Sequence, residues 1–369
     1  MYGSERHLLD IISFFSKSND VALISFAKGE MLKYVEDINI NTFHIGWLPN
    51  INIFLIMLRH VKLNKPELIH CHQPKATFIG SIIGRLLGIP VIVTIHSKAY
   101  DHVLVHNNFF KKIVVYLFHK ITTYISELLA SKIVYVNKTM YATASFKYKS
   151  IYIANWLNPN LELNSTKKLA TSSNVSFLSI GSITKAKGYD LLFDFFEYLK
   201  INSFNFNANI YGDIQGDLYE KNKERLLPLK EVVFHGFKTD LKQAYREADI
   251  YVLFSRSETF GLTYLEAMSQ GLPIICLDLD ELINLIPNDN ILVKDIEEAY
   301  LKLQKILNNK TYEIECINSI NEYNKDNGKY DYSFLFAWNH MKEIMLKEKK
   351  FTMDNNRKWI THVPDVKIL

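Results

Sequence analysis

Short apolar segments alternate with amphipathic helical patterns over most of this chain. Four segments in the first half have the length and β-branched content of buried strands: 20–26, 68–72, 90–96 and 132–137. Five more follow in the second half: 175–181, 207–213, 232–236, 249–255 and 273–278. Strands that alternate with helices in this way predict parallel βαβ units and doubly wound sheets, an α/β fold.

The two groups of strands are separated by the polar stretch 155–174, which is rich in Asn, Ser and Thr and is typical of a linker. The 369 residues, 48% of them apolar, are enough for two cores. We therefore predict an N-terminal domain over 1–160 and a C-terminal domain over 161–330. A helix over 331–350 should pack on the first domain by its apolar face, followed by a polar tail over 351–369.

The chain opens with a glycine turn at Gly3, an amphipathic helix and then the first predicted strand. A doubly wound domain normally has a strand before such a turn. Here the first strand is missing, so we expect the coding sequence to extend further upstream.

Composition excludes several classes of protein. The formal net charge is only +4, without a basic stripe, so we expect no nucleic-acid partner. The three cysteines, Cys71, Cys276 and Cys316, favour a reducing compartment. The N-terminus lacks the pattern of a signal peptide, and the apolar run 76–95 is interrupted by Arg85 and Pro90. A cytoplasmic location follows, and a periplasmic sugar-binding protein is disfavoured.

The stretch "SRSETFGLTYLEAMSQGLPII" at 255–275 carries the strongest functional signal. It follows a predicted buried strand and brings a helix N-terminus to the carboxyl end of that strand, where open α/β sheets bind ligands. Free N–H groups there favour a phosphate, and Gly261 allows the backbone to approach it. Glu266 lies about one turn inside the helix and Glu258 lies in the loop. A nucleotide sugar would offer its diphosphate, ribose and sugar hydroxyls to these groups in order.

This stretch resembles the Glu-x7-Glu signature of retaining glycosyltransferases of the GT-B fold, in particular glycosyltransferase family 4. The matching positions are Glu258, Phe260, Gly261, Glu266, Ala267, Met268, Gly271, Pro273 and Ile274. The resemblance implies two Rossmann-like domains that face a cleft, with the C-terminal helix returning to the first domain. The alternative interpretation is that Glu266 is a solvated helix residue and Glu258 a loop charge.

The segment "FLSIGSITKAKGYDLL" is similar to the family's strand, turn and helix that bind the donor's diphosphate. Lys187, before Gly188, matches the family's lysine. Ser182 stands where the family has an arginine, and a serine cannot replace a bidentate guanidinium. Lys185 either compensates for this loss or is an ordinary solvated lysine.

Further donor contacts are implied by the same resemblance. Phe237 and Lys238 would lie near the nucleobase, although a Gly-Phe turn is equally expected of any α/β loop. Gly212 is a close-approach glycine, and Phe260 and Leu262 flank Gly261 in the donor site.

In the first half, "GSERHLLDI" resembles the family's Gly-Gly-x-Glu-Arg-His start, with Ser4 in place of the second glycine. Gly3 would face the donor phosphate. The resemblance places His96, at a strand end, close to the donor sugar and the acceptor; the alternative is a strand-end histidine without a role. His70 and His72 point to the same face of a strand, but no third ligand is evident, so we expect no metal.

The resemblance implies transfer of a hexosyl unit with retention of configuration from a UDP- or GDP-sugar, without a cofactor or metal. Lys187 and the backbone at Gly261 would stabilise the leaving diphosphate, Glu258 would hold sugar hydroxyls, and Glu266 the ribose. Two other classes stay open. A nucleotide-sugar epimerase would release free epimerised donor, and a non-catalytic subunit would bind the donor without transfer.

The acceptor side is less specific. The segment 107–125 combines aromatic residues with Lys111, Lys112 and Lys120, as a helix at a membrane interface does. Its other interpretation is a core helix with a solvated basic edge. The interfacial interpretation predicts a glycan or lipid-linked acceptor and contact with an anionic inner membrane, as in bacterial lipopolysaccharide or capsule synthesis.

Overall fold

The computed structural model describes most of the chain. The described residues are 3–26, 30–38, 40–46, 50–97, 109–153, 155, 174–238, 240–258, 260–279, 282 and 292–308, with three short strands at 332–335, 358–361 and 367–368. Apart from the first three residues, the chain divides into two compact units, one of residues 49–320 and one of residues 4–48 and 321–369.

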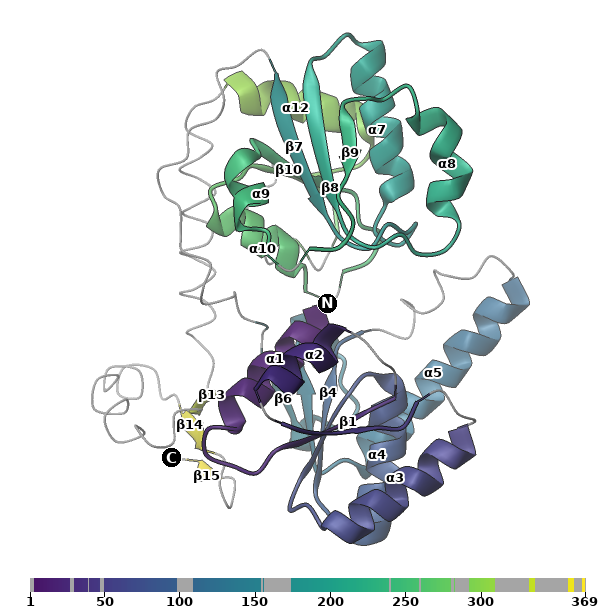
Figure 1. Ribbon diagram of the computed structural model, residues 1–369, viewed down its shortest axis with the longest axis vertical. Coiled ribbons are helices and arrows are strands. Elements are labelled where there is room, and N and C mark those ends of the chain that lie inside the picture. The colour runs from purple at the N-terminus through teal and green to yellow at the C-terminus, as the bar shows by residue number, and fades with distance from the viewer. Residues whose placement is uncertain are drawn as a thin grey trace. The chain divides into compact units, whose positions relative to one another are not determined.

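The second half of the larger unit contains a six-stranded parallel sheet (Figure 1). Its strands are β7 (Val175–Ile180), β8 (Phe206–Tyr211), β9 (Val232–Phe234), β10 (Ile250–Leu253), β11 (Ile274–Leu277) and β12 (Leu292–Val293). They lie in the order β12-β11-β10-β7-β8-β9, and every neighbouring pair is parallel. The winding direction therefore reverses between β7 and β10. Ligands of doubly wound sheets bind at such a reversal, beyond the carboxyl ends of the strands.

Helices connect and cover these strands: α7 (Tyr189–Ile201), α8 (Leu218–Leu226), α9 (Lys242–Glu247), α10 (Leu262–Ser269) and α12 (Ile296–Asn308). Helix α7 carries a dense aromatic face because its apolar residues recur at helical spacing. Phe195 and Phe196 are fully buried, and each ring centroid lies 6.0 Å from that of Phe177 in β7. This packing fixes the segment that leads from β7 into α7.

The first half of the larger unit has a four-stranded parallel sheet in the order β3-β4-β5-β6. Its strands are β3 (Ile69–His72), β4 (Val91–Ile95), β5 (Lys132–Tyr135) and β6 (Ser150–Tyr152). Its helices are α3 (Asn50–Asn64), α4 (Pro74–Leu87), α5 (Phe109–Leu129) and α6 (Lys138–Ala142), with a 3-10 helix at Lys147–Lys149. Val91, Val93 and Ile133 form the centre of its core.

The smaller unit contains α1 (Gly3–Phe15), β1 (Ala22–Ser25), α2 (Glu30–Asp37) and β2 (Asn41–His44), with β1 and β2 parallel. Ile12, Met31 and Val35 are buried together. A separate sheet joins β13 (Tyr332–Leu335), β14 (Lys358–Thr361) and β15 (Lys367–Ile368).

All nine predicted strands are present, and every pair between them is parallel, as βαβ units require. The sequence did not predict β2, β6 and β12, and β12 has only two residues, too few for a clear pattern.

The predicted helix over 331–350 is wrong at 332–335, which form β13. Tyr332 and Phe334 alternate with smaller or aliphatic residues, and aromatic residues at a period of two favour a strand. The rest of 331–350, most of the linker 155–174, and the predicted boundaries near 160, 330 and 350 lie outside the described residues.

Candidate active site

Two loops meet at the reversal between β7 and β10. Residues 181–188 follow β7, and residues 254–261 follow β10. Their backbones are in direct contact, since the N–H of Arg256 donates to the carbonyl of Ala186 at 2.9 Å. The loops therefore form one connected edge at the position where a doubly wound sheet receives its ligand.

Lys187 and Glu258 are brought together at this edge. Lys187 Nζ lies 2.7 Å from Oε1 and 2.8 Å from Oε2 of Glu258. The buried hydroxyl of Ser255 donates to Oε1 at 2.7 Å. The Glu258 side chain is 7% exposed and that of Lys187 is 31% exposed, so the carboxylate is buried while the lysine side chain is partly accessible. A buried carboxylate is tolerated here because it is both ion-paired and hydrogen-bonded.

Glu266 is held in a different way. It lies in α10 and is 4% exposed, and Tyr245 of α9 donates its hydroxyl to Glu266 Oε2 at 2.7 Å. The interpretation of Glu258 and Glu266 as solvated charges is therefore wrong, because both side chains are buried.

Helix α10 begins directly after the loop. Its N-cap is Gly261 in the left-handed conformation (φ 80°), and its first residue is the half-buried Leu262. Phe260 is buried, so its side chain contributes to packing. The first N–H groups of a helix have no intrahelical acceptor, so this end can donate to an anion.

Buried tyrosines support α10 against the sheet. Burial raises the pKa of Tyr251 and Tyr264 well above the ordinary value, so both hydroxyls stay protonated. Tyr251 donates to Thr263 Oγ1 at 2.8 Å, and Tyr264 donates to the carbonyl of Leu253 at 3.0 Å.

The loop after β7 is clamped by a residue that the sequence did not single out. Arg256 donates to both carboxylate oxygens of Asp190, at 2.6 and 3.0 Å, and to the carbonyl of Lys185 at 2.7 Å. The Lys185 side chain is exposed and Ser182 is half-buried. A signal was present in the sequence, because Arg256 is the one cation inside the signature loop.

Glycines allow the loops to come this close. A Cβ on Gly188 (φ 67°) would lie 1.7 Å from the carbonyl oxygen of Phe254, inside any permissible contact. A Cβ on Gly212, predicted as a close-approach glycine, would lie 1.9 Å from the carbonyl oxygen of Gly181. The close approach at Gly212 is thus to neighbouring backbone.

Phe237 and Lys238 follow β9, the last strand of the sheet, and β8 separates β9 from β7. Phe237 is half-buried and Lys238 is exposed. On the same edge, the rings of Tyr211 and His235 are stacked with centroids 4.4 Å apart. The role of Phe237 and Lys238 near a base stays a prediction.

His96 follows β4 in the first sheet. Its Nε2 lies 2.9 Å from Nδ1 of the buried His72, and His70 Nε2 lies 2.8 Å from Thr94 Oγ1. His70 and His72 share a face as predicted, with ring centroids 4.3 Å apart. Gly3 is the first residue of α1. The roles of His96 and Gly3, and the expected absence of a metal, stay predictions.

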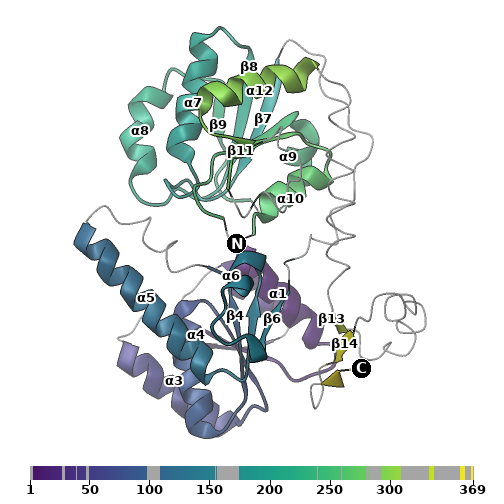
Figure 2. The ribbon, with the colours of Figure 1, turned by 180° about the vertical axis from the view of Figure 1, so that it is seen from behind.

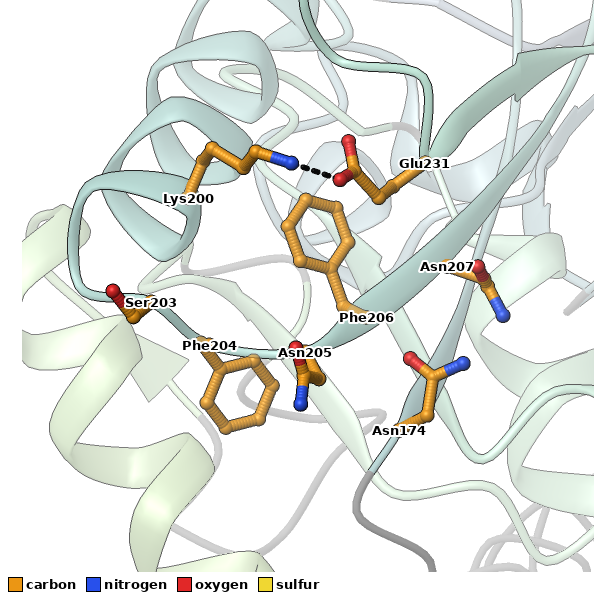
Figure 3. Close-up of a pocket in the computed structure, with 8 residues that line it drawn as sticks. All are labelled: Asn174, Lys200, Ser203, Phe204, Asn205, Phe206, Asn207 and Glu231. Carbon is orange, nitrogen blue, oxygen red and sulfur yellow. Dashed lines mark hydrogen bonds and ion pairs between the residues drawn. The ribbon is translucent and has the colours of Figure 1, made fainter.

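A shallow pocket lies at the other end of the second sheet (Figure 3). Its lining residues are Asn174, Lys200, Ser203, Phe204, Asn205, Phe206, Asn207 and Glu231, with Lys200 and Glu231 paired. Apart from Lys200, which lies in the last turn of α7, they lie at or just before the amino ends of β7, β8 and β9, whereas Lys187 and Glu258 follow carboxyl ends. This pocket is therefore separate from the candidate active site.

Comparisons with known proteins agree with this fold. The family model described as Glycosyl transferases group 1 matches residues 162–326, and the one described as Glycosyltransferase Family 4 matches residues 1–144. The crystal structure of Anabaena HepE with UDP and glucose has a TM-score of 0.71 at 18% identity, covering 88% of this chain and 92% of that one.

Two curated relatives are also similar. An uncharacterized 41.2 kDa protein in the cps region of Klebsiella pneumoniae is 26% identical over 61% of this chain, and the match spans 63% of that relative, just under two thirds. An Escherichia coli UDP-Gal:alpha-D-GlcNAc-diphosphoundecaprenol alpha-1,3-galactosyltransferase is 22% identical over 82% of this chain and 84% of its own length.

The fold and the family models therefore define a glycosyltransferase of the GT-B type. The chain belongs to the family that these two models describe, the glycosyl transferases group 1 with their family 4 amino-terminal region.

Proposed function

We propose that this chain is a retaining glycosyltransferase that moves a hexosyl unit from a nucleotide-diphosphate sugar, a UDP- or GDP-sugar, to a glycan or lipid-linked acceptor. The observation that carries the proposal is the meeting of Lys187 and Glu258 at the strand reversal, beside the N-terminus of α10. This arrangement offers a cation, a buried carboxylate and free helix N–H groups at the edge where doubly wound sheets bind nucleotides.

Each group has a distinct task in this proposal. Lys187 and the N–H groups after Gly261 stabilise the negative charge that develops on the leaving diphosphate. Glu266, oriented by Tyr245, holds the ribose, and Glu258 accepts hydrogen bonds from the transferred sugar. His96 lines the acceptor side. The charge on the leaving group is thus neutralised by protein groups, and no metal or cofactor is required.

The Lys187–Glu258 pair also sets an order of events. A diphosphate that enters the site competes with Glu258 for the ammonium group of Lys187. As Lys187 turns to the phosphate, Glu258 keeps its bond from Ser255 and gains acceptor capacity for sugar hydroxyls. Donor binding is thereby coupled to preparation of the sugar subsite.

The relatives support an acceptor of bacterial surface polysaccharide synthesis. One relative lies in a cps region, and another acts on a diphosphoundecaprenol-linked sugar. We place the reaction in lipopolysaccharide O-antigen or capsule assembly, by a cytoplasmic enzyme that is peripheral at the inner membrane. The finer choices of donor sugar, base and linkage follow from the assay below.

The test is incubation with a panel of UDP-, GDP- and dTDP-sugars, with thermal-shift measurement of binding. Donors that bind are then offered to undecaprenyl-diphosphate-linked sugars. The expected result is one preferred donor and a product whose new anomeric bond, measured by NMR, keeps the donor's configuration. An inverted product contradicts retention, free epimerised donor without acceptor supports an epimerase, and tight binding without transfer to any acceptor supports a non-catalytic subunit.

A further inference from the structure

Helix α5 carries an apolar stripe on its exposed side. Six residues spaced alternately by four and three positions form it: Phe110, Val114, Leu117, Ile121, Tyr124 and Leu128. Each is at least 49% exposed, and Phe110 reaches 78%. Residues at this spacing share one face of a helix, so the stripe is continuous along α5.

The opposite side of α5 accounts for its contact with the rest of the lobe, where α5 lies beside α4 (Figures 1 and 2). Thr122, Ser126 and Glu127 are buried in the second half of the helix. From 110 to 121, by contrast, no residue is buried. An amphipathic helix of a monomeric domain turns its apolar stripe to the core. Here the stripe faces away from the core and leaves a large apolar surface exposed, which is a mark of an interaction site.

The width and the charge of this apolar face indicate which kind of partner binds it. Ile113 and Phe118, 43% and 58% exposed, widen the apolar face to roughly 140° at about 100° per residue. Lys111 and Lys120 flank it on its two sides, whereas Lys112 lies near the opposite side of the helix, and no Asp or Glu occurs in α5 before Glu127.

A second copy of the chain is a poor match for this face. A paired-helix seam is narrower and is flanked by charges of both signs, whereas two copies of α5 would bring lysines together. An anionic lipid surface complements the lysines and accepts the wide apolar face. The helix meets it from one side only, because no helix in the described part of the chain is long and apolar enough to cross a membrane.

We propose that α5 lies in the plane of an anionic membrane surface, with the stripe 110–128 among the upper acyl chains and its lysines at the head groups. This deepens the proposed function, on which it rests for its biological meaning, by naming the surface that brings the enzyme to a lipid-linked acceptor. Of the two interpretations of this segment, the structure favours the interfacial one.

The test is flotation of the full chain with vesicles. We expect it to bind vesicles of phosphatidylglycerol mixed with phosphatidylcholine and to bind phosphatidylcholine alone far less. The double variant Lys111→Gln, Lys120→Gln should bind anionic vesicles roughly thirtyfold more weakly. The triple variant Val114→Gln, Leu117→Gln, Ile121→Gln should lose binding at least about tenfold. Leu301→Gln, a 57% exposed leucine of α12, is the matched control and should bind normally.

The thermal shift caused by the preferred nucleotide sugar is measured on every variant. A variant that is folded and has lost only its membrane-binding surface should keep the normal shift, whereas a misfolded variant should not. A tryptophan reporter tests the same surface with a single substitution. The fluorescence emission of the new tryptophan should shift to the blue on anionic vesicles in Leu117→Trp but not in Leu301→Trp. Absence of binding by the unsubstituted chain, normal binding by the stripe variant, or a dimer in solution that the stripe variant dissolves would each overturn the inference. Vesicle binding without any sugar transfer would instead count against the proposed function alone.

Discussion

The ammonium group of Lys187 lies within 2.8 Å of both carboxylate oxygens of Glu258, although 71 residues separate them in the sequence. Each residue was expected to contact a different part of one donor, the diphosphate and the sugar. Their pairing means that neither can be changed without altering the other. Removing Lys187 leaves a buried carboxylate without its counter-ion, and such a group is costly.

Replacing Lys187 with Ala should lower sugar transfer by at least roughly a hundredfold, the scale for one preorganised electrostatic contact. Because Glu258 then lacks its partner, the melting temperature should fall as well, and adding Glu258→Gln should restore part of it without restoring transfer. Initial rates and thermal denaturation of the two single variants and the double variant measure this. Lys221→Ala, which removes an exposed lysine of α8, is the control. Near-normal turnover by Lys187→Ala would contradict the assignment.

Replacing Tyr245 with Phe should weaken donor binding about tenfold, since a hydrogen bond to a charged group contributes about 1.5–3 kcal/mol. The change leaves the ring in place and removes only the hydroxyl that orients Glu266. Calorimetric titration with the preferred donor measures it. Tyr135→Phe is a matched control, because it removes a tyrosine hydroxyl of β5 from another buried carboxylate, that of Glu127 in α5. Equal loss of donor affinity in both variants would show that Tyr245 has no specific positioning role.

Replacing Arg256 with Ala should release the loop that carries Lys187 and lower transfer roughly tenfold through lost positioning. Its effect on stability should be only about 1 kcal/mol, because the ion pair with Asp190 is partly exposed. Arg256→Lys should not restore transfer, since an ammonium group cannot form the two parallel hydrogen bonds to the Asp190 carboxylate. Arg225→Ala, which breaks a similar pair with Asp194 and Glu197 on α7, should change stability alike and leave transfer intact.

Treatment with EDTA should leave transfer unchanged. In the proposed mechanism the charge on the leaving diphosphate is neutralised by Lys187 and by the N–H groups at the start of α10. Rates are compared before and after dialysis against the chelator, with and without added Mg²⁺ or Mn²⁺. A loss of activity that either ion restores would contradict this scheme.

The order of elements was predictable because the signal for a buried parallel strand is local. Runs such as 175–181 and 249–255 are mostly apolar, and both appear as central strands. The pairing of β7 with β10 was not predictable from spacing, since it depends on where the chain reverses its winding. Short edge strands such as β12 leave too few residues for a pattern.

Within the candidate site, the sequence predicted the charged residues but not their partners. Glu258, Glu266 and Lys187 stand in recognisable motifs, whereas Tyr245 and Arg256 act through contacts between segments distant in sequence or in a loop without periodicity. Helix α5 shows a related limit. The same aromatic and basic pattern fits a core helix or an interfacial one, and only the exposure of the stripe distinguishes them.

Replacing Gly188 with Ala should be among the most damaging single changes near the site. The new Cβ would lie 1.7 Å from the carbonyl oxygen of Phe254, and the left-handed backbone (φ 67°) is itself unfavourable for alanine. Since backbone cannot yield as a flexible side chain does, we expect a loss of at least about 3 kcal/mol in the free energy of unfolding. Chemical denaturation measures it, and donor binding should fall too because Lys187 is the adjacent residue.

Gly216→Ala is the matched control: its φ is 73° but no heavy atom lies within 4 Å of the new Cβ, so it should lose only about 1 kcal/mol. Similar stability of the two variants would show that the β7 and β10 loops do not pack as closely as described.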